Sequence, residues 1–326
     1  LRTELEEHRA RLAATATTTV AAPAKVSTGQ RSSKITMEPL PGEQLPKAPD
    51  YERHILKNTP LDHIWSFINP LMLYGRHLGI KGAVVRQLAA GDFKAIPEES
   101  RKSIEIWQTV EDVKNFSRKQ GLLAPRAVYQ YFHAHRDGDA VAIVSGTNGS
   151  AREVARFTFP RQTITEGLCL SDYVHDDKDA GDNIALFVVT AAHGVRAQAE
   201  EWKQKGEYLK SHALWALALE SAEAYAEYLH GKLRGLWGFP DPIETTMMER
   251  YQAKYRGKRY SFGYPACPRL SDQEILFKLL KPEDIGVHLT DGYMMDPEAS
   301  VSAIVFHHRQ ANYFSVGEAS TDNRIG

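Results

Sequence analysis

Residues 195–237 read VRAQAEEWKQKGEYLKSHALWALALESAEAYAEYLHGKLRGLW, and apolar side chains recur through them at helical spacing. A stripe of this kind predicts a long helix with one face packed on a core. Gly206, Gly231 and Gly235 are the positions at which this helix could break or end. The residues expected to face inward are Leu214, Leu217, Ala218, Ala222, Tyr225, Leu229 and Leu233.

The run IALFVVT, at residues 184–190, comes shortly before this helix. Its residues are mostly β-branched or aromatic, and apolar and polar positions do not alternate. Such a run is typical of a central strand that is buried on both faces of a sheet. The sequence therefore predicts a covered sheet with the long helix packed on it.

Other strands and helices alternate along the chain too irregularly for a doubly wound parallel sheet. We expect an α+β fold with a bent, mostly antiparallel sheet flanked by helices, preceded by a flexible linker. One expected helix has Thr59 as its N-cap and Pro60 at its first position, and it breaks at Pro70. The further strands are expected at 127–132, 140–144, 152–159, 287–290, 300–308 and 312–316, and the further helices at 103–120 and 272–279.

The composition is that of an ordinary soluble protein and excludes several classes of function. The 326 residues carry a formal charge of −1, so no basic patch for nucleic acid or an anionic membrane is expected. The two cysteines, Cys169 and Cys267, cannot form a disulfide scaffold, which favours a reducing cytoplasm. No run reaches the ~18 apolar residues that a membrane span needs.

The first fifty residues differ in composition from the rest. Residues 1–12 are charged and helix-prone, residues 13–34 are mainly Ala, Thr and Ser, and residues 35–50 contain four prolines. Such segments cannot bury enough apolar surface to order themselves. We expect residues 1–50 to be a helix remnant and an Ala/Thr/Pro-rich interdomain linker, and residues 51–326 to form the folded domain.

Residues 259–268 read RYSFGYPACP and are called the wall segment here. Two prolines and a glycine prevent a regular helix, and the large side chains are too apolar for a solvated linker. A stiff, irregular segment suits the wall of a binding site, and the planar guanidinium of Arg259 suits a carboxylate. The alternative is a structural corner in which the prolines only turn the chain.

The pattern R-x-x-x-G-Y-P-A-C-P resembles the S-adenosylmethionine-binding signature of the reactivation domain of cobalamin-dependent methionine synthase. Further blocks in the family's order extend the resemblance over most of residues 50–318. These blocks are AEAYAEYLH at 222–230, LTD at 289–291, M-x-P-x-A-S-V-S at 295–302 and NYF at 312–314.

The resemblance implies a site for each part of S-adenosylmethionine. Arg259 would bind its carboxylate, and Glu223 or Asp62 would bind its ammonium. The match at Asp62 is loose, since His63 competes for the position and a charge in the first helical turn would look the same. The complete set of expected ligand contacts is Asp62, Glu223, Arg259, Tyr264, Pro265, Ala266, Cys267, Tyr313 and Phe314.

The remaining contacts concern the sulfonium and the adenosine. The ring of Tyr264 and the backbone of residues 263–267 could face the sulfonium, because aromatic faces and carbonyl oxygens attract cations. Tyr313, with Phe314, could hold the adenosine, because aromatic faces suit flat bases. No general base is expected, because the methyl leaves a positively charged sulfur.

The family's chemistry implies the partners. S-adenosylmethionine would methylate reduced cobalamin after a flavodoxin or similar reductase supplies one electron, and the home reaction moves a methyl group from methyltetrahydrofolate to homocysteine. The chain has neither a D-x-H-x-x-G loop nor a set of zinc cysteines. We therefore expect a separate cobalamin-binding module, in cis or in trans, and zinc only in an absent homocysteine-binding module.

The sequence departs from the family at two places. Arg269 and Leu270 follow the wall segment where the family has an acidic residue and a histidine, and Glu298 replaces a glycine in the block at 297–300. These changes leave ligand binding intact as an expectation and bear mainly on the docking of cobalamin.

Two other classes of function stay open. The chain could be an S-adenosylmethionine-binding sensor or docking module that transfers no methyl group. A metal-dependent enzyme could use His133 and His135, or the helix face shared by Glu223, Glu227 and His230. We expect no metal site, because further ligands near the histidine pair are lacking and such a helix face is usually a solvated row of charges.

Overall fold

The structure is a computed structural model that describes residues 45–145, 152–163, 167–179 and 181–317. Contacts divide the chain into two units, Leu1–Arg31 and Ser32–Gly326, and every described residue belongs to the second unit. Most of the expected linker at residues 1–50 lies outside the described residues, and residues 45–50 form neither helix nor strand. The domain boundary at residue 50 stays a prediction.

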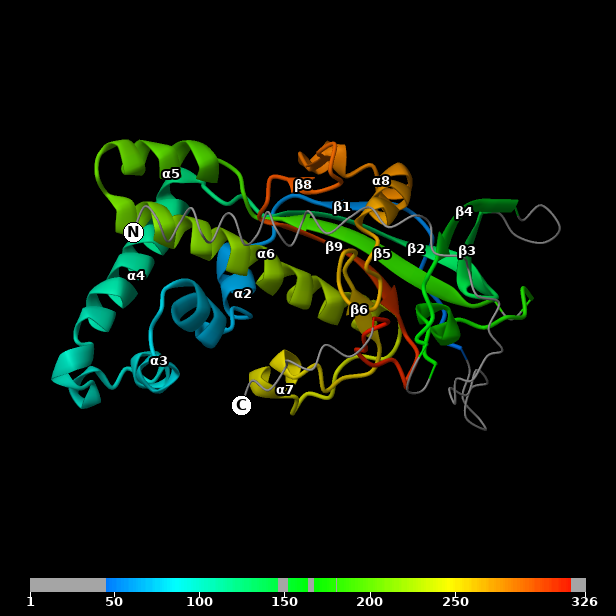
Figure 1. Cartoon of the computed structure of the whole chain (residues 1–326), viewed down its shortest axis with the longest axis horizontal. Helices are drawn as coiled ribbons and strands as arrows, with labels where there is room; N and C mark the ends of the chain where they lie inside the picture. The colour runs from blue at the N-terminus through cyan, green and yellow to red at the C-terminus, as the bar shows by residue number, and fades with distance from the viewer. Residues whose placement is uncertain (1–44, 146–151, 164–166, 180, 318–326) are drawn as a thin grey trace. The chain divides into compact units, whose positions relative to one another are not determined.

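One antiparallel sheet organises the described part of the chain (Figure 1). Its strand order is β4-β3-β2-β5-β9-β6, and β1 pairs with β2 beside β3. Every one of these pairings is antiparallel, which confirms the expected class of sheet. The strands are β1 (His54–Leu56), β2 (Arg126–Asp137), β3 (Ala140–Ser145), β4 (Arg152–Thr158), β5 (Asn183–Thr190), β6 (Lys258–Tyr260) and β9 (Ser300–Phe306). A separate small hairpin joins β7 (His288–Leu289) to β8 (Met295–Asp296).

Strand β5 lies at the centre of the sheet and is buried along its whole length. Ala185, Phe187 and Val189 belong to one hydrophobic core, and the alternate residues Ile184 and Leu186 belong to the other. Successive strand residues point to opposite faces, so the two cores lie on the two sides of the sheet. The predicted burial on both faces is confirmed.

Helices cover the two faces unequally. Helix α6 runs along one face and α8 lies on the other (Figure 1). The core on the α6 side also takes side chains from the helical segments between residues 61 and 120. The helices are α2 (Leu61–Trp65), α3 (Gly82–Ala89), α4 (Lys102–Gln120), α5 (Val195–Gln204), α6 (Tyr208–Leu236), α7 (Met247–Tyr251) and α8 (Gln273–Leu280). The short helical segments are η1 (Leu71–His77), η2 (Phe93–Ala95), η3 (Glu98–Ser100), η4 (Leu170–Tyr173), η5 (Leu270–Asp272) and η6 (Pro282–Ile285).

The long helical stretch divides once. It breaks at Gly206, whose φ of +79° favours glycine, and α6 then continues for 29 residues, or ~43 Å. The predicted break at Gly206 is confirmed, whereas Gly231 and Gly235 lie inside α6. A helix buried along one face overrides the weak helix propensity of glycine, which amounts to about 1 kcal/mol per residue.

Two local expectations were wrong. Residues 312–316 form no strand, because the backbone of Asn312 is held instead by the hydroxyls of Tyr173 and Tyr260. The expected helix between Thr59 and Pro70 also differs. Thr59 does not cap it, because its hydroxyl bonds the hydroxyl of Tyr225 at 2.7 Å, and α2 begins at Leu61, after Pro60, and already ends at Trp65. In the described ranges, no helix has the length and apolar character needed to cross a membrane.

The buried centre predicts a large difference between two leucine truncations. Leu186 on β5 is fully buried, whereas Leu209 at the start of α6 is 42% exposed. Leu186→Ala should lower the free energy of unfolding by about 2–5 kcal/mol, because it removes packed methyl groups and leaves a cavity. Leu209→Ala should change it by less than about 0.5 kcal/mol. Denaturant unfolding measures both values, and similar losses would contradict the assigned core.

Candidate functional site

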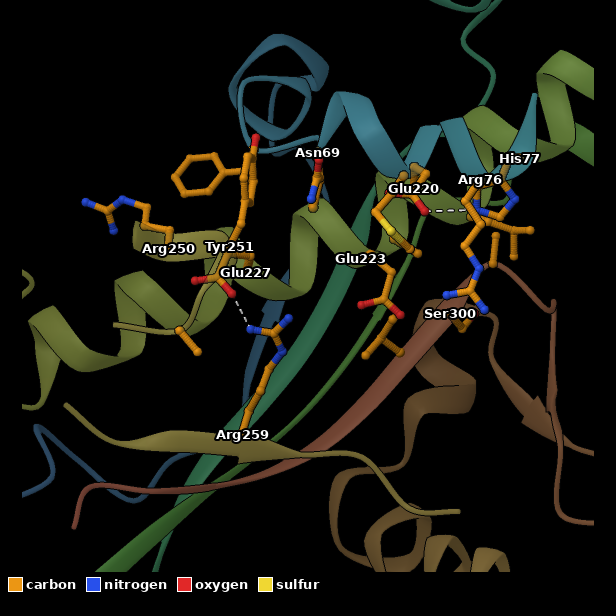
Figure 2. A pocket seen from close by; sticks show the side chains of 18 of the residues that line it. Asn69, Arg76, His77, Glu220, Glu223, Glu227, Arg250, Tyr251, Arg259 and Ser300 are labelled. Atoms are coloured by element: carbon orange, nitrogen blue, oxygen red, sulfur yellow. Dashed lines mark hydrogen bonds and ion pairs between the residues drawn. The ribbon is translucent and has the colours of Figure 1, made fainter. Parts of the chain in front are cut away.

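A cavity of about 650 Å³ opens between η1, α6, α7 and the edge of the sheet formed by β6 and β9 (Figure 2). Helix α6 supplies three carboxylates to it, from Glu220, Glu223 and Glu227. Their spacing of three and four residues places them on one face of the helix. The opposite face of α6 is buried on the sheet, so the packing of the helix aims these carboxylates into the cavity.

Arg259 reaches the cavity from β6. The pairing of Arg259 with Val305 of β9 fixes its position on the sheet edge. Its guanidinium forms an ion pair with Glu227 across the cavity (Figure 2). Burial disfavours the charge, but the carboxylate of Glu227, together with Tyr255, Tyr313 and Glu223, outweighs it, so the pKa of Arg259 is raised and Arg259 stays a cation.

Glu223 lies between the two ends of the cavity and has no ion-pair or hydrogen-bond partner among the described residues (Figure 2). Glu223 is exposed to solvent through the cavity, although protein lies on most sides of it. Burial therefore raises the pKa of Glu223, and the nearby Arg259 partly opposes the shift. An unpaired carboxylate in such surroundings is suited to receive a cationic group.

The other end of the cavity contains a second pair. Glu220 lies 2.9 Å from Nε2 of His77 on η1, and Nε2 of His212 donates to the His77 carbonyl at 2.9 Å. These contacts fix η1 to α6. The carboxylate of Glu220 is thus already engaged, which leaves Glu223 as the unpaired acid of the α6 row.

The wall segment continues from β6 as a turn that closes on itself. The Gly263 N–H donates to the Cys267 carbonyl at 2.9 Å, and the Cys267 N–H donates to the Tyr264 carbonyl at 2.9 Å. Gly263 has a φ of +87°, and a Cβ there would lie 3.0 Å from a methyl carbon of Leu270. Glycine adopts this φ without strain, and any other residue here would also press on the Leu270 side chain.

This turn lines a second cavity of about 360 Å³ beside the first. The second cavity is bordered by Pro265, Ala266, Cys267 and Phe314. Burial raises the pKa of Cys267 to about 12, so its thiol stays protonated and donates to the Ser261 carbonyl at 3.0 Å. The wall segment thus turns the chain and also lines a cavity, and its contact with a ligand stays a prediction.

Four of the predicted site residues border both cavities, namely Glu223, Arg259, Tyr264 and Tyr313. The ring of Tyr313 is 50% exposed and packs edge to face on Tyr260, at 5.4 Å between ring centroids. Charged and aromatic groups thus meet where the two cavities join.

Asp62 lies elsewhere. Its exposed carboxylate accepts a 2.6 Å hydrogen bond from Arg118 of α4, and neither Asp62 nor His63 lines either cavity. The expectation that Asp62 faces a ligand is corrected here, because this α2 carboxylate pairs with α4. Of the two acids expected to meet an ammonium, Glu223 is the one that lines the cavities.

The sequence analysis predicted neither the ion pair between Glu227 and Arg259 nor the contact of Tyr255 with Glu227. Glu227 stands four residues after Glu223, so its spacing was the available signal, but the sequence analysis treated it only as a possible metal ligand or a solvated charge. The solvated row was the wrong interpretation, since Glu227 and His230 are buried. Tyr255 gives no local signal, because its contact with Glu227 joins two distant segments.

The metal alternative has no support in the geometry. The ring of His133 stacks on Tyr51, at 3.8 Å between ring centroids. Across the described ranges, no three side chains of His, Cys, Asp or Glu come together in an arrangement that could hold a metal ion.

Comparison with known proteins identifies the domain. A family model described as the activation domain of vitamin B12 dependent methionine synthase matches residues 87–324. The chain belongs to this family. A solved structure, the crystal structure of the MetH reactivation domain bound to AdoHcy, superimposes with a TM-score of 0.76 at 25% identity, covering 85% of this chain and 84% of that one.

Two mycobacterial relatives are longer proteins. The activation domain is 27% identical to methionine synthase of Mycobacterium leprae over 290 residues, which is 84% of this chain and 23% of the relative. It is 32% identical to methionine synthase of Mycobacterium tuberculosis over 210 residues, which is 60% of this chain and 17% of the relative. The chain thus spans about a fifth of the length of these curated relatives.

The unpaired Glu223 predicts a pH-dependent cost in stability. Its pKa is raised in the folded protein, so the folded state binds this proton more tightly than the unfolded state does. Its contribution to stability is therefore lost as the pH rises above the ordinary value of 4.5. Glu223→Gln should raise the Tm at pH 7, and the gain should shrink towards pH 4.

Thermal unfolding at both pH values checks this, with the exposed Glu244→Gln as the control. The control should change the Tm by the same small amount at both pH values. A gain for Glu223→Gln that is equal at pH 4 and pH 7 would contradict the electrostatic cost.

Proposed function

We propose that this chain binds S-adenosylmethionine and presents its methyl group to reduced cobalamin held by a separate module, so that an inactive methionine synthase re-enters its cycle. The observation that carries the proposal is the junction of the two cavities. There a guanidinium and an unpaired carboxylate, from Arg259 and Glu223, lie beside an aromatic and apolar wall. The AdoHcy bound to the similar MetH reactivation domain supports this ligand class.

The parts of the ligand match the parts of the junction. Its carboxylate fits Arg259 and its ammonium fits Glu223. The face of Tyr264, which is 61% exposed, suits the sulfonium. Tyr313 and Phe314 border the smaller cavity and suit the flat adenine. The proposed contacts at Pro265, Ala266 and Cys267 are those of the self-closed turn.

In the proposed reaction, this chain has to bind the methyl donor and align it with the cobalamin. Reduced cobalamin on its module supplies the nucleophile, and the sulfonium is a good leaving group, so no residue here has to move a proton. Rigid placement of the methyl donor is the contribution of this chain, and such placement is a recognised source of rate enhancement. A flavodoxin-like reductase is the proposed donor of the single electron.

The larger reaction is part of the same proposal. The chain spans about a fifth of the methionine synthases it matches, so we propose that it is one portion of a 5-methyltetrahydrofolate–homocysteine methyltransferase of methionine biosynthesis. A zinc ion would belong to the homocysteine-binding module, which this chain does not include. The cytoplasmic location stays a prediction.

Two residues that depart from the family pattern, Arg269 and Leu270, contact other parts of the domain. Arg269 donates to the Thr158 carbonyl and pairs with Asp272 at 3.3 Å, and Leu270 packs beside Gly263. Neither Arg269 nor Leu270 lines a cavity of the candidate site. Ligand binding is therefore compatible with these two substitutions, whereas the third departure, Glu298, lines the larger cavity.

The alternative is a sensor or docking module that binds S-adenosylmethionine without methyl transfer. Absorbance spectroscopy separates the two functions. The chain is mixed with a reduced cobalamin module and S-adenosylmethionine, and methyl transfer should convert the spectrum to that of methylcobalamin. Tight ligand binding with an unchanged spectrum would favour the sensor.

Arg259 should contribute strongly to ligand affinity. Arg259→Ala removes a charged hydrogen bond to the ligand carboxylate and should weaken binding of S-adenosylmethionine by about 1.5–3 kcal/mol. Isothermal titration calorimetry measures the change, and Arg152→Ala on the exposed surface of β4 serves as the control. Wild-type affinity in Arg259→Ala would remove Arg259 from the site.

A further inference from the structure

The guanidinium of Arg259 is contacted by Glu227, and Glu227 is contacted in turn by Tyr255. We propose that Tyr255 and Glu227 are positioning residues, which fix one side of the Arg259 guanidinium so that its remaining donors meet the carboxylate of the ligand. The inference rests on the proposed function, because it assumes that Arg259 binds the amino-acid end of a nucleoside ligand.

The first of these contacts joins Arg259 to Glu227. It is a hydrogen bond that Nη1 of Arg259 donates to Oε2 of Glu227. A guanidinium has five N–H donors in a planar fork, so this bond leaves other donors for a second carboxylate. Because Glu227 is buried, moving Arg259 away would leave an unpaired carboxylate behind, which is costly. The pair therefore restrains the guanidinium and leaves several of its N–H donors available for a ligand.

The second contact joins Glu227 to Tyr255. The Tyr255 hydroxyl donates to the same oxygen, Oε2, at 3.1 Å. Burial raises the pKa of Tyr255, so the hydroxyl keeps its proton for this bond. Two donors thus converge on one oxygen, while Oε1 has no partner within the described part of the chain. This arrangement fixes the rotation of the carboxylate and hence the direction of Arg259.

Tyr255 is itself clamped. The guanidinium carbon of Arg234 lies 3.8 Å from the centroid of the Tyr255 ring, and His230 packs on the ring edge to face at 5.3 Å. Arg234 is fixed in turn by two hydrogen bonds to Asp241, at 2.8 and 2.7 Å. Lys258 Nζ also donates to the Tyr255 carbonyl at 2.6 Å. The hydroxyl of Tyr255 is therefore held in place by the segments on both sides of α7.

The test compares two nucleosides that differ only in the amino-acid end, whose carboxylate Arg259 would bind and whose ammonium Glu223 would bind. S-adenosylhomocysteine carries the amino-acid end, and 5′-methylthioadenosine lacks it. Tyr255→Phe removes only the hydroxyl that orients Glu227. Calorimetry should show a five- to tenfold rise in the Kd of S-adenosylhomocysteine and no change for 5′-methylthioadenosine.

Tyr131→Phe is the matched control. The hydroxyl of Tyr131 also donates to α6, at the Leu233 carbonyl and 2.9 Å away, but Tyr131 lines neither cavity of the site. Its loss should leave both affinities unchanged. Thermal unfolding confirms that each variant is folded at the temperature of the titration.

A double-mutant cycle tests whether Tyr255 acts through Arg259. In an Arg259→Lys background, the charge remains but the fork is lost, so adding Tyr255→Phe should change the Kd of S-adenosylhomocysteine by less than twofold. An equal penalty in both backgrounds refutes action through Arg259.

The failures of the two proposals are distinguishable. If the wild type binds S-adenosylhomocysteine and Tyr255→Phe binds it equally well, the positioning role is refuted and the proposed function stands. Equal weakening of both nucleosides by Tyr255→Phe also refutes the positioning role. If the wild type binds neither nucleoside, the proposed function itself is refuted, and the inference falls with it.

Discussion

The burial of α6 on the central strands is the constraint on which the rest of this structure depends. The helix gives one face to the core shared with β2, β5 and β9, so its rotation about its own axis is fixed. That rotation aims Glu223 and Glu227 at the cavity. Arg259 is placed from the same sheet, since β6 pairs with β9 and β9 with β5. The same sheet therefore fixes the positions of both the carboxylates on α6 and Arg259 on β6.

The electrostatics of the site follow from that frame. A guanidinium taken out of water requires a counter-charge, and the carboxylate of Glu227 provides it. Glu223 has no such partner among the described residues, and desolvation by the surrounding protein raises its pKa, so we expect its ionised form to cost stability. Proteins commonly retain a destabilising group of this kind where a ligand will later compensate it. The unpaired acid is therefore the feature that most clearly distinguishes this cavity from a structural ion-pair network.

The wall segment shows how one short stretch can serve both structure and binding. Its turn is closed by hydrogen bonds from Gly263 to Cys267 and from Cys267 to Tyr264, and a side chain at Gly263 would press on Leu270. The prolines remove amide donors that a ladder would need, so the segment leaves the sheet after β6. This stiffness gives Tyr264 a defined place at the junction of the two cavities. The buried Cys267 thiol contributes packing and a hydrogen bond, since its raised pKa keeps it from acting as a thiolate.

The sequence by itself determined the long helix, its break at Gly206 and the central strand at residues 184–190, because hydrophobic periodicity is a local signal of burial. The motif also selected Arg259, Glu223 and the wall segment, which the fold brings to one place. Only the tertiary structure decided that Asp62 pairs with α4, that residues 312–316 form no strand, and that Tyr255 holds Glu227 behind Arg259. Each of these outcomes depends on which distant side chain lies within hydrogen-bond reach. That proximity is set by the packing of separate segments, and no local pattern of residues encodes it.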